Sequence, residues 1–219
     1  MLGRKICEKF DKELGNIKVD CVIIENQISP IANRMKTIQG MIAQYFIMNE
    51  TKTIEADFFI ISTGARAKDF PSIKIDKKHV LSYKEAMILD EIPKSMTIIG
   101  AGAIGVEFAH IYNTFGTDVT IVESLSNILP VEDEEISVEL EKQYNKKNIS
   151  VLTSTKVTSI NISKNMMVET VLDNGKIVTS EKVLIAVGVK PNIEDLNLEI
   201  CNIKLDNGWI KVNENMQTN

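Results

Sequence analysis

The chain has 219 residues, a length that allows one large domain or two small ones. Hydrophobic residues make up 44% of it and charged residues 25%, a composition typical of a globular protein with a core and unlike that of a disordered chain. The net charge of −5 argues against a nucleic-acid partner, which normally meets a basic face. No apolar run approaches the ~20 residues that cross a bilayer, and residues 1–6 lack the apolar stretch of a signal peptide. We therefore expect a cytoplasmic protein without membrane contact.

The three cysteines, Cys7, Cys21 and Cys201, stand too far apart for a Cys-x-x-Cys pair or a zinc-type spacing. An odd number also leaves one thiol unpaired. We therefore expect no metal site and interpret the three side chains as small buried hydrophobes.

The first part of the chain mixes helical and extended patterns. Apolar residues recur every four positions from Leu2 to Leu14, which predicts a helix over residues 2–14. Alternating and continuous apolar runs around a polar turn then predict strands over residues 19–24, 41–48 and 53–56.

A continuous apolar run at residues 58–61 predicts a strand that is buried on both faces. Further on, Ser82 and Glu85 have the spacing of a capping box, which predicts a short helix over residues 83–89. The mostly polar residues 90–94 resemble a linker, so we place a domain boundary there.

The clearest pattern is a buried strand, a glycine-rich turn, a helix and a second buried strand. The strands are predicted over residues 96–99 and 118–122. The apolar face of the helix is predicted to consist of Ile104, Phe108, Ile111 and Phe115. Strand–helix–strand crossovers of this kind are right-handed and join parallel strands.

A second amphipathic helix is predicted from about residue 132 to residue 147, because acidic residues open it and lysines close it. Its apolar stripe is predicted to be Ile136, Leu140 and Tyr144. A third strand of the same sheet is expected at residues 151–152.

The residue pattern in the last third of the chain predicts an antiparallel sheet in addition to the parallel one. Residues 155–162 and 166–172 look extended, and Asn174-Gly175 predicts a hairpin with a type I′ turn. An apolar strand over residues 183–187 ends at Gly188. Together the patterns predict an α/β fold in which a Rossmann-like parallel sheet is combined with an antiparallel β-meander.

The motif Gly-x-Gly-x-x-Gly, formed by Gly100, Gly102 and Gly105, follows a predicted strand and opens a predicted helix, which is the context of a dinucleotide site. The first glycine allows the tight turn, the second lets a pyrophosphate approach the backbone, and the third lets the helix pack close to the strands. The helix start at Ala103 and Ile104 offers N–H groups without intrahelical partners to the phosphates.

Glu123 closes the second strand, 23 positions after Gly100, where an acidic residue can bind both hydroxyls of the adenosine ribose. The carboxylate also disfavours a 2′-phosphate, because two like charges ~4 Å apart repel by roughly 4 kcal/mol at an effective dielectric constant of about 20. No Lys or Arg occurs between residues 95 and 141 to offset that repulsion. The sequence therefore favours NAD(H) over NADP(H) as its small-molecule partner.

With these motifs the chain resembles the flavin-dependent pyridine nucleotide–disulfide oxidoreductases, and among them most the dihydrolipoamide dehydrogenases. The resemblance runs from about residue 55 to the end of the chain. It is carried by residues 60–66, 80–86, 98–108, 119–123, 186–192 and 208–212.

The resemblance implies a three-part organisation. Residues 1–92 would be a partial FAD-binding domain, residues 93–205 the NAD-binding domain, and residues 206–219 the start of a return segment to the FAD domain. In the complete enzyme, FAD would pass electrons from dihydrolipoamide to NAD+.

The resemblance also implies roles for individual residues. Thr63 and Gly64 would contact FAD, and Gly188 would approach the nicotinamide ribose. Glu107 would lie near the place where flavin and nicotinamide meet. Gly188 is followed by Val189, where the family often has an arginine.

The Cys-x4-Cys redox pair and the first Gly-x-Gly-x-x-Gly of the family do not occur in this sequence, and neither His79 nor His110 has the context of the catalytic His-Glu pair. We therefore expect the central portion of an enzyme, inactive alone towards dihydrolipoamide. Alternatives are an NADH oxidase-type flavin reductase and a nucleotide-binding module without catalysis. The family is homodimeric and serves 2-oxoacid dehydrogenase complexes, but this sequence does not include its dimer-forming domain.

Overall fold

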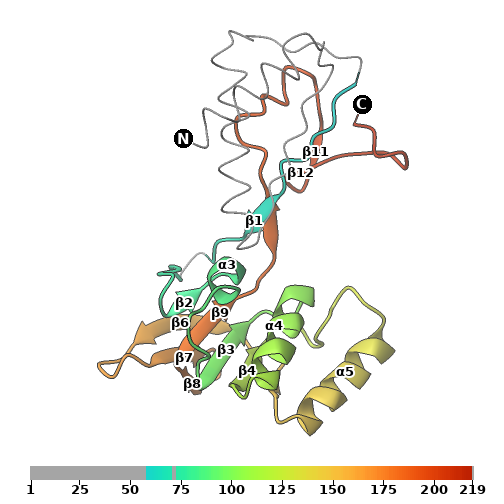
Figure 1. Ribbon diagram of the computed structural model, residues 1–219. Coiled ribbons are helices and arrows are strands. Elements are labelled where there is room, and N and C mark those ends of the chain that lie inside the picture. Colours follow the sequence, from blue (N-terminus) through green and yellow to red (C-terminus); the bar gives the residue numbers. More distant parts are fainter. Residues whose placement is uncertain (1–57, 71–72, 219) are drawn as a thin grey trace, which may run out of the picture. The chain divides into compact units, whose positions relative to one another are not determined.

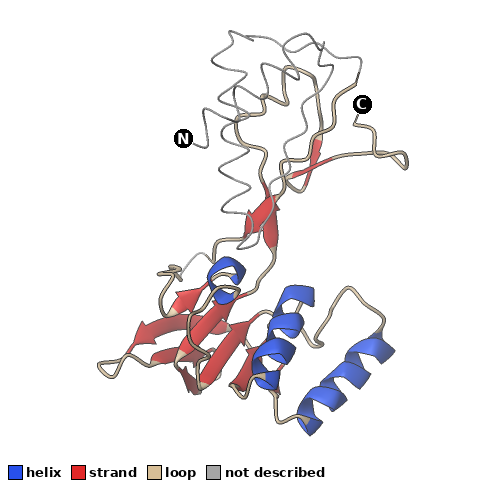
Figure 2. Cartoon of the chain, viewed as in Figure 1, coloured by secondary structure: helices blue, strands red, loops and turns tan. Residues whose placement is uncertain are grey.

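The computed structural model describes residues 58–70 and 73–218 (Figures 1 and 2). The helix predicted over residues 2–14, the strands predicted over 19–24, 41–48 and 53–56, and Cys7 and Cys21 lie outside the described residues. The prediction of a buried side chain is wrong for Cys201, which is exposed. The chain divides into two compact units, of which the larger runs from Arg66 to Lys190. The described part of the other unit comprises residues 58–65 and 191–218.

A five-stranded parallel sheet forms the centre of the larger unit. Its strands lie in the order β2-β9-β3-β4-β5, with every neighbouring pair parallel. Their bounds are Val80–Leu81, Lys182–Ile185, Ser95–Ile99, Asp118–Val122 and Ser150–Leu152. The sheet confirms the predicted strand–helix–strand unit and the parallel pairing of its strands.

The boundary that we predict near residue 93 falls inside this unit. Strand β2, which precedes it, pairs with β9, with Val80 opposite Val183 and Leu81 opposite Leu184. Backbone hydrogen bonds therefore tie the segment before residue 93 into the parallel sheet. The assignment of residues 1–92 to the FAD-binding domain stays a prediction.

Side chains alternate between the two faces of the sheet, and each face is covered by a different layer. Met96 and Ile98 of β3 pack with α4 (Ala103–Thr114) and α5 (Glu134–Lys146) on one face. Ile99 packs with the meander on the other face. The antiparallel meander consists of β6 (Val157–Ile162), β7 (Val168–Leu172) and β8 (Ile177–Ser180). This arrangement confirms the predicted combination of a parallel sheet and a meander.

The buried face of α4 differs from the predicted apolar face. Ile111 is 44% exposed and Phe115 is 60% exposed, while Ile104 and Phe108 are only partly buried against the core. The helix lies close to the sheet at its N-terminal end, where a Cβ atom on Gly105 would lie 3.5 Å from the Ile98 side chain, so the residues buried there are small. The buried residues of the helix are Gly105, Val106, Ala109 and Tyr112.

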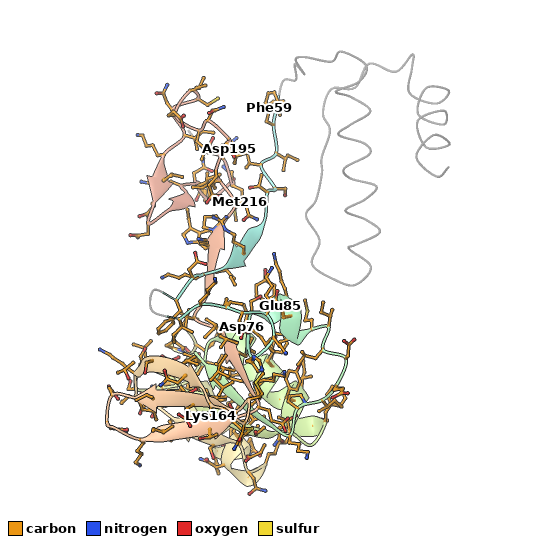
Figure 3. All side chains as sticks on the ribbon, turned by 90° about the vertical axis from the view of Figure 1, so that its left-hand side faces the viewer. Phe59, Asp76, Glu85, Lys164, Asp195 and Met216 are labelled. Carbon is orange, nitrogen blue, oxygen red and sulfur yellow. The ribbon has the colours of Figure 1, made fainter. Side chains whose placement is uncertain are left out.

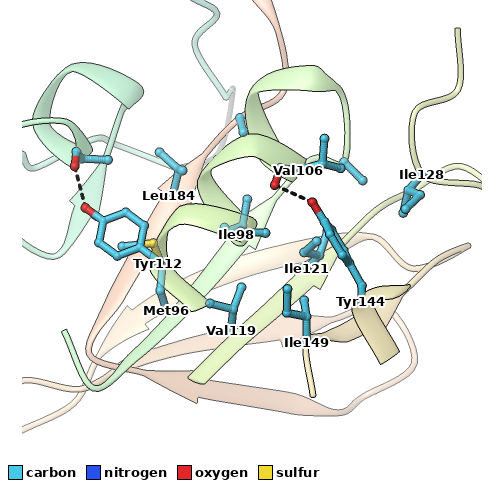
Figure 4. Close-up of a cluster of buried hydrophobic side chains, with 14 of the residues drawn as sticks. Met96, Ile98, Val106, Tyr112, Val119, Ile121, Ile128, Tyr144, Ile149 and Leu184 are labelled. Carbon is cyan, nitrogen blue, oxygen red and sulfur yellow. Dashed lines mark hydrogen bonds between the residues drawn. The ribbon is translucent and has the colours of Figure 1, made fainter. Parts of the chain in front are cut away.

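Helix α5 packs mainly through Tyr144, whose hydroxyl donates a hydrogen bond of 2.7 Å to the carbonyl of Val106 (Figure 4). Leu140 is partly buried against the same core, but Ile136 is 56% exposed. The predicted stripe is therefore correct at Tyr144 and wrong at Ile136, because the neighbouring Ser137, which is 2% exposed, lies on the buried face of the helix instead.

The hairpin between β7 and β8 is confirmed, but its turn is not of type I′. Gly175 has a φ angle of 81°, whereas Asn174 is not among the described residues with positive φ. Val171 pairs with Ile177, and the N–H of Leu172 donates to the carbonyl of Lys176. The connection thus contains three residues with a glycine in the left-handed position, another common hairpin geometry.

The predicted buried strand at residues 58–61 is wrong. These residues have no strand assignment, and Phe58 is 86% exposed and Phe59 68% exposed. An apolar run becomes a buried strand only when other strands flank it, and no described strand pairs with this one. Regular pairing begins further on, where β1 (Ala65–Ala67) meets β10 (Val189–Pro191).

The remaining short elements are a helix that begins at a capping box and a two-stranded hairpin. The predicted capping box is present at α3 (Tyr83–Ala86), which ends before residue 89; the hydroxyl of Tyr112 donates to the carbonyl of Ala86. In the smaller unit, β11 (Leu205–Asp206) and β12 (Trp209–Ile210) form a hairpin. No helix in the described part of the chain is long and apolar enough to cross a membrane.

The carboxylate of Asp76 organises the turn that leads into β2 (labelled in Figure 3). Its Oδ1 accepts hydrogen bonds from the N–H groups of Lys78, His79 and Val80 at 2.7–2.8 Å. Burial alone would raise the pKa of this carboxyl, but the three N–H donors and the His79 ring lower it to about 2. The ionised form is therefore the one that stabilises the turn.

This pKa predicts an acid-sensitive contribution to stability. Because the folded pKa of about 2 lies below the ordinary unfolded value of about 3.9, the contribution is present above pH ~4 and lost as the pH falls towards 2. The Asp76→Asn variant should be less stable than the wild type by on the order of 1–2 kcal/mol at pH 7, and this gap should close near pH 2. Urea denaturation of both proteins across this range measures the gap; a constant gap would contradict the assignment.

Candidate functional site

Two glycines make the close packing of the β3–α4 turn possible. Gly100 has a φ angle of 102°, and a Cβ atom there would lie 2.5 Å from the carbonyl oxygen of Ala186. A Cβ atom on Gly105 would lie 1.9 Å from the carbonyl oxygen of Gly100. Both positions exclude larger residues because neighbouring backbone occupies the space. These contacts agree with the tasks that we predict for the first and third glycines.

Gly102 differs, since no atom lies within 4 Å of the place where its Cβ would be. It is the N-cap of α4, has a φ angle of −71° and makes no side-chain capping bond. The first turn of a helix has N–H groups without intrahelical partners and a partial positive charge. Backbone without side chains therefore faces open space at the positive end of α4.

Glu123 lies at the end of β4 with its carboxylate directed to the glycine turn. Its Oε2 accepts a hydrogen bond of 2.7 Å from the N–H of Ala101, and its Oε1 accepts bonds from the N–H of Leu125 (2.8 Å) and the hydroxyl of Ser124 (3.1 Å). The residue is 7% exposed. A carboxylate has about four acceptor positions, so three bonds from the protein leave room for a ligand hydroxyl.

Ala101 is fixed from both sides. Besides its N–H bond to Glu123, its carbonyl accepts a bond of 2.8 Å from the N–H of Leu129 in the loop before α5. Both backbone groups of this fully buried residue are thereby satisfied. The loop after β4 thus holds the glycine turn in place.

These residues surround a pocket of about 760 Å³ within the larger unit. Its size lies in the range of small-molecule and cofactor sites. Most of its wall is apolar or glycine backbone, and the polar groups gather near Glu123. The lining residues from the turn and the strand ends include Gly100, Gly102, Ala103, Ile104, Glu123 and Gly188.

Gly188 joins the pocket from the other side, after β9. Its φ angle is 103°, no atom lies within 4 Å of a Cβ built there, and its carbonyl accepts a bond of 3.0 Å from the N–H of Lys68. The structure therefore brings together six residues that we predict as NAD contacts, although Gly188 is far from the others in sequence.

Two predicted residues on α4 do not line the pocket. Gly105 faces the sheet, and Glu107 lies on an exposed part of the helix. Burial and, to a smaller extent, the charge of Glu107 together raise the pKa of the Tyr144 hydroxyl to about 12. Tyr144 therefore stays protonated and keeps its bond to Val106. The role that we predict for Glu107 beside nicotinamide stays a prediction.

The residues predicted to contact FAD, Thr63 and Gly64, belong to the smaller unit. Their carbonyl oxygens accept hydrogen bonds from the side chain (3.0 Å) and backbone N–H (2.9 Å) of Asn192. Gly64 has a φ angle of 72°, which favours glycine at this position. The contact with FAD stays a prediction.

Several lining residues are not among the site residues predicted from the sequence. Ser124 and Leu125 follow Glu123 directly and could have been found from their place after a strand end. Thr155, Lys156 and Val157 come from a distant segment, and only the folded chain brings them to the pocket. The remaining lining residues that were not predicted as site residues are Phe70, Ile99, Val122, Pro130, Val131, Ala186 and Val187.

Comparison with known proteins agrees with this geometry. The family model described as pyridine nucleotide-disulphide oxidoreductase matches residues 7–219. The chain belongs to this family. The predicted resemblance and the α/β fold class are thereby confirmed.

Individual proteins of known sequence or structure are similar to this chain over most of its length. A dihydrolipoyl dehydrogenase of Rhizobium etli is 41% identical over 172 residues, which cover 76% of this chain and 35% of the relative. A solved NAD-dependent persulfide reductase from A. fulgidus has a TM-score of 0.64 at 30% identity, covering 75% of this chain and 32% of that one. LpdA of Mycobacterium tuberculosis has a TM-score of 0.67 at 23% identity, covering 97% of this chain and 52% of that one. The chain spans about a third of the length of the curated relatives it matches.

The packing of the turn predicts different outcomes for two equivalent substitutions. Gly105→Ala should lower the free energy of unfolding by about 2 kcal/mol or more, because the new methyl group overlaps the Gly100 carbonyl. Gly102→Ala should lower it by less than about 1 kcal/mol, because the methyl group enters open space. Thermal denaturation of both variants measures the difference, and equal stability would show that α4 lies further from the sheet.

Proposed function

We propose that this chain is the NAD(H)-binding portion of a flavoprotein disulfide oxidoreductase, in which electrons pass from dihydrolipoamide through FAD to NAD+. The observation that supports it most is the shared pocket of the open Gly102 backbone and the Glu123 carboxylate. The identity to dihydrolipoyl dehydrogenases supports the choice of the disulfide substrate.

The pocket fits a dinucleotide in two places. At the start of α4, backbone N–H groups and the helix dipole suit the diphosphate, and the absence of a side chain at Gly102 leaves it room. At the end of β4, the remaining acceptor capacity of Glu123 suits ribose hydroxyls. A dinucleotide that joins both places would lie across the carboxyl ends of β3 and β4, as ligands of open α/β sheets do.

The residues of this chain would position the nucleotide, and the bound FAD would supply the two-electron chemistry. Gly188 allows close approach at the far side of the pocket, because a Cβ there would point into open space. We propose that Thr63 and Gly64 contact FAD in the complete enzyme and that Glu107 lies near the nicotinamide. A homodimer and a 2-oxoacid dehydrogenase complex as partner are parts of the same proposal.

The proposal predicts that Gly102→Ala weakens NADH binding in a protein that still folds. The methyl group would occupy the approach of the diphosphate, so the dissociation constant should rise tenfold or more, about 1.4 kcal/mol. Titration of NADH fluorescence, with a thermal scan of the same sample, measures both properties. A folded variant that binds NADH as the wild type does would contradict the placement.

Glu123 should determine the preference for NADH over NADPH. The wild type should bind NADH at least about a hundredfold more tightly, because a 2′-phosphate would meet the carboxylate. Glu123→Gln keeps one acceptor oxygen, so the variant should bind NADH less tightly and lose most of this preference. Parallel titrations with both nucleotides test this, and an unchanged ratio would show that Glu123 does not face the ribose.

A further inference from the structure

Two charged side chains line the pocket, Glu123 and Lys156. The carboxylate of Glu123 already accepts three hydrogen bonds. The ammonium group of Lys156 has neither a hydrogen bond nor an ion pair with any residue in the described part of the chain. Most other lysines in the described part of the chain also lack such a partner, so the feature that distinguishes Lys156 is its place in the pocket wall. Lys156 thus presents an unpaired positive charge at a pocket wall.

The backbone of Lys156 is held in place beside Glu123. The N–H of the preceding residue, Thr155, donates to the Glu123 carbonyl at 2.9 Å, and the carbonyl of Lys156 accepts from the N–H of Asp173 at 2.8 Å. Thr155 is itself buried, and its hydroxyl donates to the Thr153 carbonyl at 2.8 Å. The backbone of Lys156 is therefore fixed directly before β6, while its ammonium group is available to contact a ligand.

A positive charge in this pocket would add to the attraction that the N-terminus of α4 exerts on a diphosphate. Its diphosphate carries two negative charges, whereas the N-terminus of α4 supplies only about half a positive charge. Glu123 adds a further negative charge, and residues 95–141, which include the turn and α4, contain no lysine or arginine. Without Lys156 the pocket would hold the phosphates with backbone dipoles alone, against the field of a buried carboxylate.

We propose that Lys156 binds a phosphate group of the dinucleotide and so contributes to nucleotide affinity. The inference rests on the proposed function, namely that the pocket binds NAD(H). A lysine acts here as a mobile point charge, which suits a phosphate that the helix N-terminus already orients.

The test compares Lys156→Gln with Lys164→Gln in the full chain. Lys164 (labelled in Figure 3) is an exposed residue between β6 and β7 and does not line the pocket, so its substitution makes the same change in net charge. Each variant is titrated with NADH, NADPH, ADP and adenosine at low ionic strength, where screening is weak. Lys156→Gln should weaken NADH and ADP about five- to tenfold, as expected for loss of one partly exposed charge contact, and leave adenosine within about twofold. Lys164→Gln should change none of them.

The four ligands distinguish the possible phosphates. Equal losses for NADH and ADP identify the diphosphate as the partner of Lys156, whereas a loss confined to NADPH would place Lys156 at the 2′-phosphate and so overturn the inference. Two further results would overturn the inference. In one, Lys156→Gln binds each of the four ligands as tightly as Lys164→Gln does. In the other, Lys156→Gln loses as much affinity for adenosine as it loses for ADP. If the wild type binds neither NADH nor ADP, the proposed function itself fails, which is a separate result.

Discussion

The buried hydrogen bond of 2.7 Å from the Ala101 N–H to the Glu123 carboxylate connects the glycine turn to the end of β4. A carboxylate this deeply buried is tolerated only when donors compensate for its lost hydration, and the turn supplies one of them. The Leu129 N–H fixes the other side of Ala101. These contacts determine where α4 begins, and the position of that helix end determines which ligand the pocket can accept.

The glycines of the larger unit divide into two kinds by what surrounds them. At Gly100 and Gly105 the space of a side chain is filled by neighbouring backbone, so these residues are required for packing. At Gly102 and Gly188 that space is open and borders the pocket, so packing gives no reason for the missing side chain. A ligand that approaches the backbone closely gives such a reason. The steric environment thus separates structural glycines from those that belong to the site.

Local patterns predicted the β3–α4–β4 unit and Glu123 because the residues concerned follow one another along the chain. The apolar face of α4 was not predictable from periodicity, since the pattern shows which residues share a face but not how close the sheet lies. Residues 58–61 have the composition of a core strand, yet burial depends on partners that composition does not supply. Lys156 was missed for a related reason: it reaches the pocket only through the pairing of distant segments.

The central claim is that a dinucleotide binds across the N-terminus of α4. Nuclear magnetic resonance of the isotope-labelled chain during titration with NADH tests it most directly. If the dinucleotide binds there, the backbone amide signals of Gly102, Ala103 and Ile104 should shift together with those around Glu123, while signals from the exposed face of α5 should stay unchanged. Shifts confined to α5 or to the smaller unit, with the glycine turn unaffected, would contradict the account.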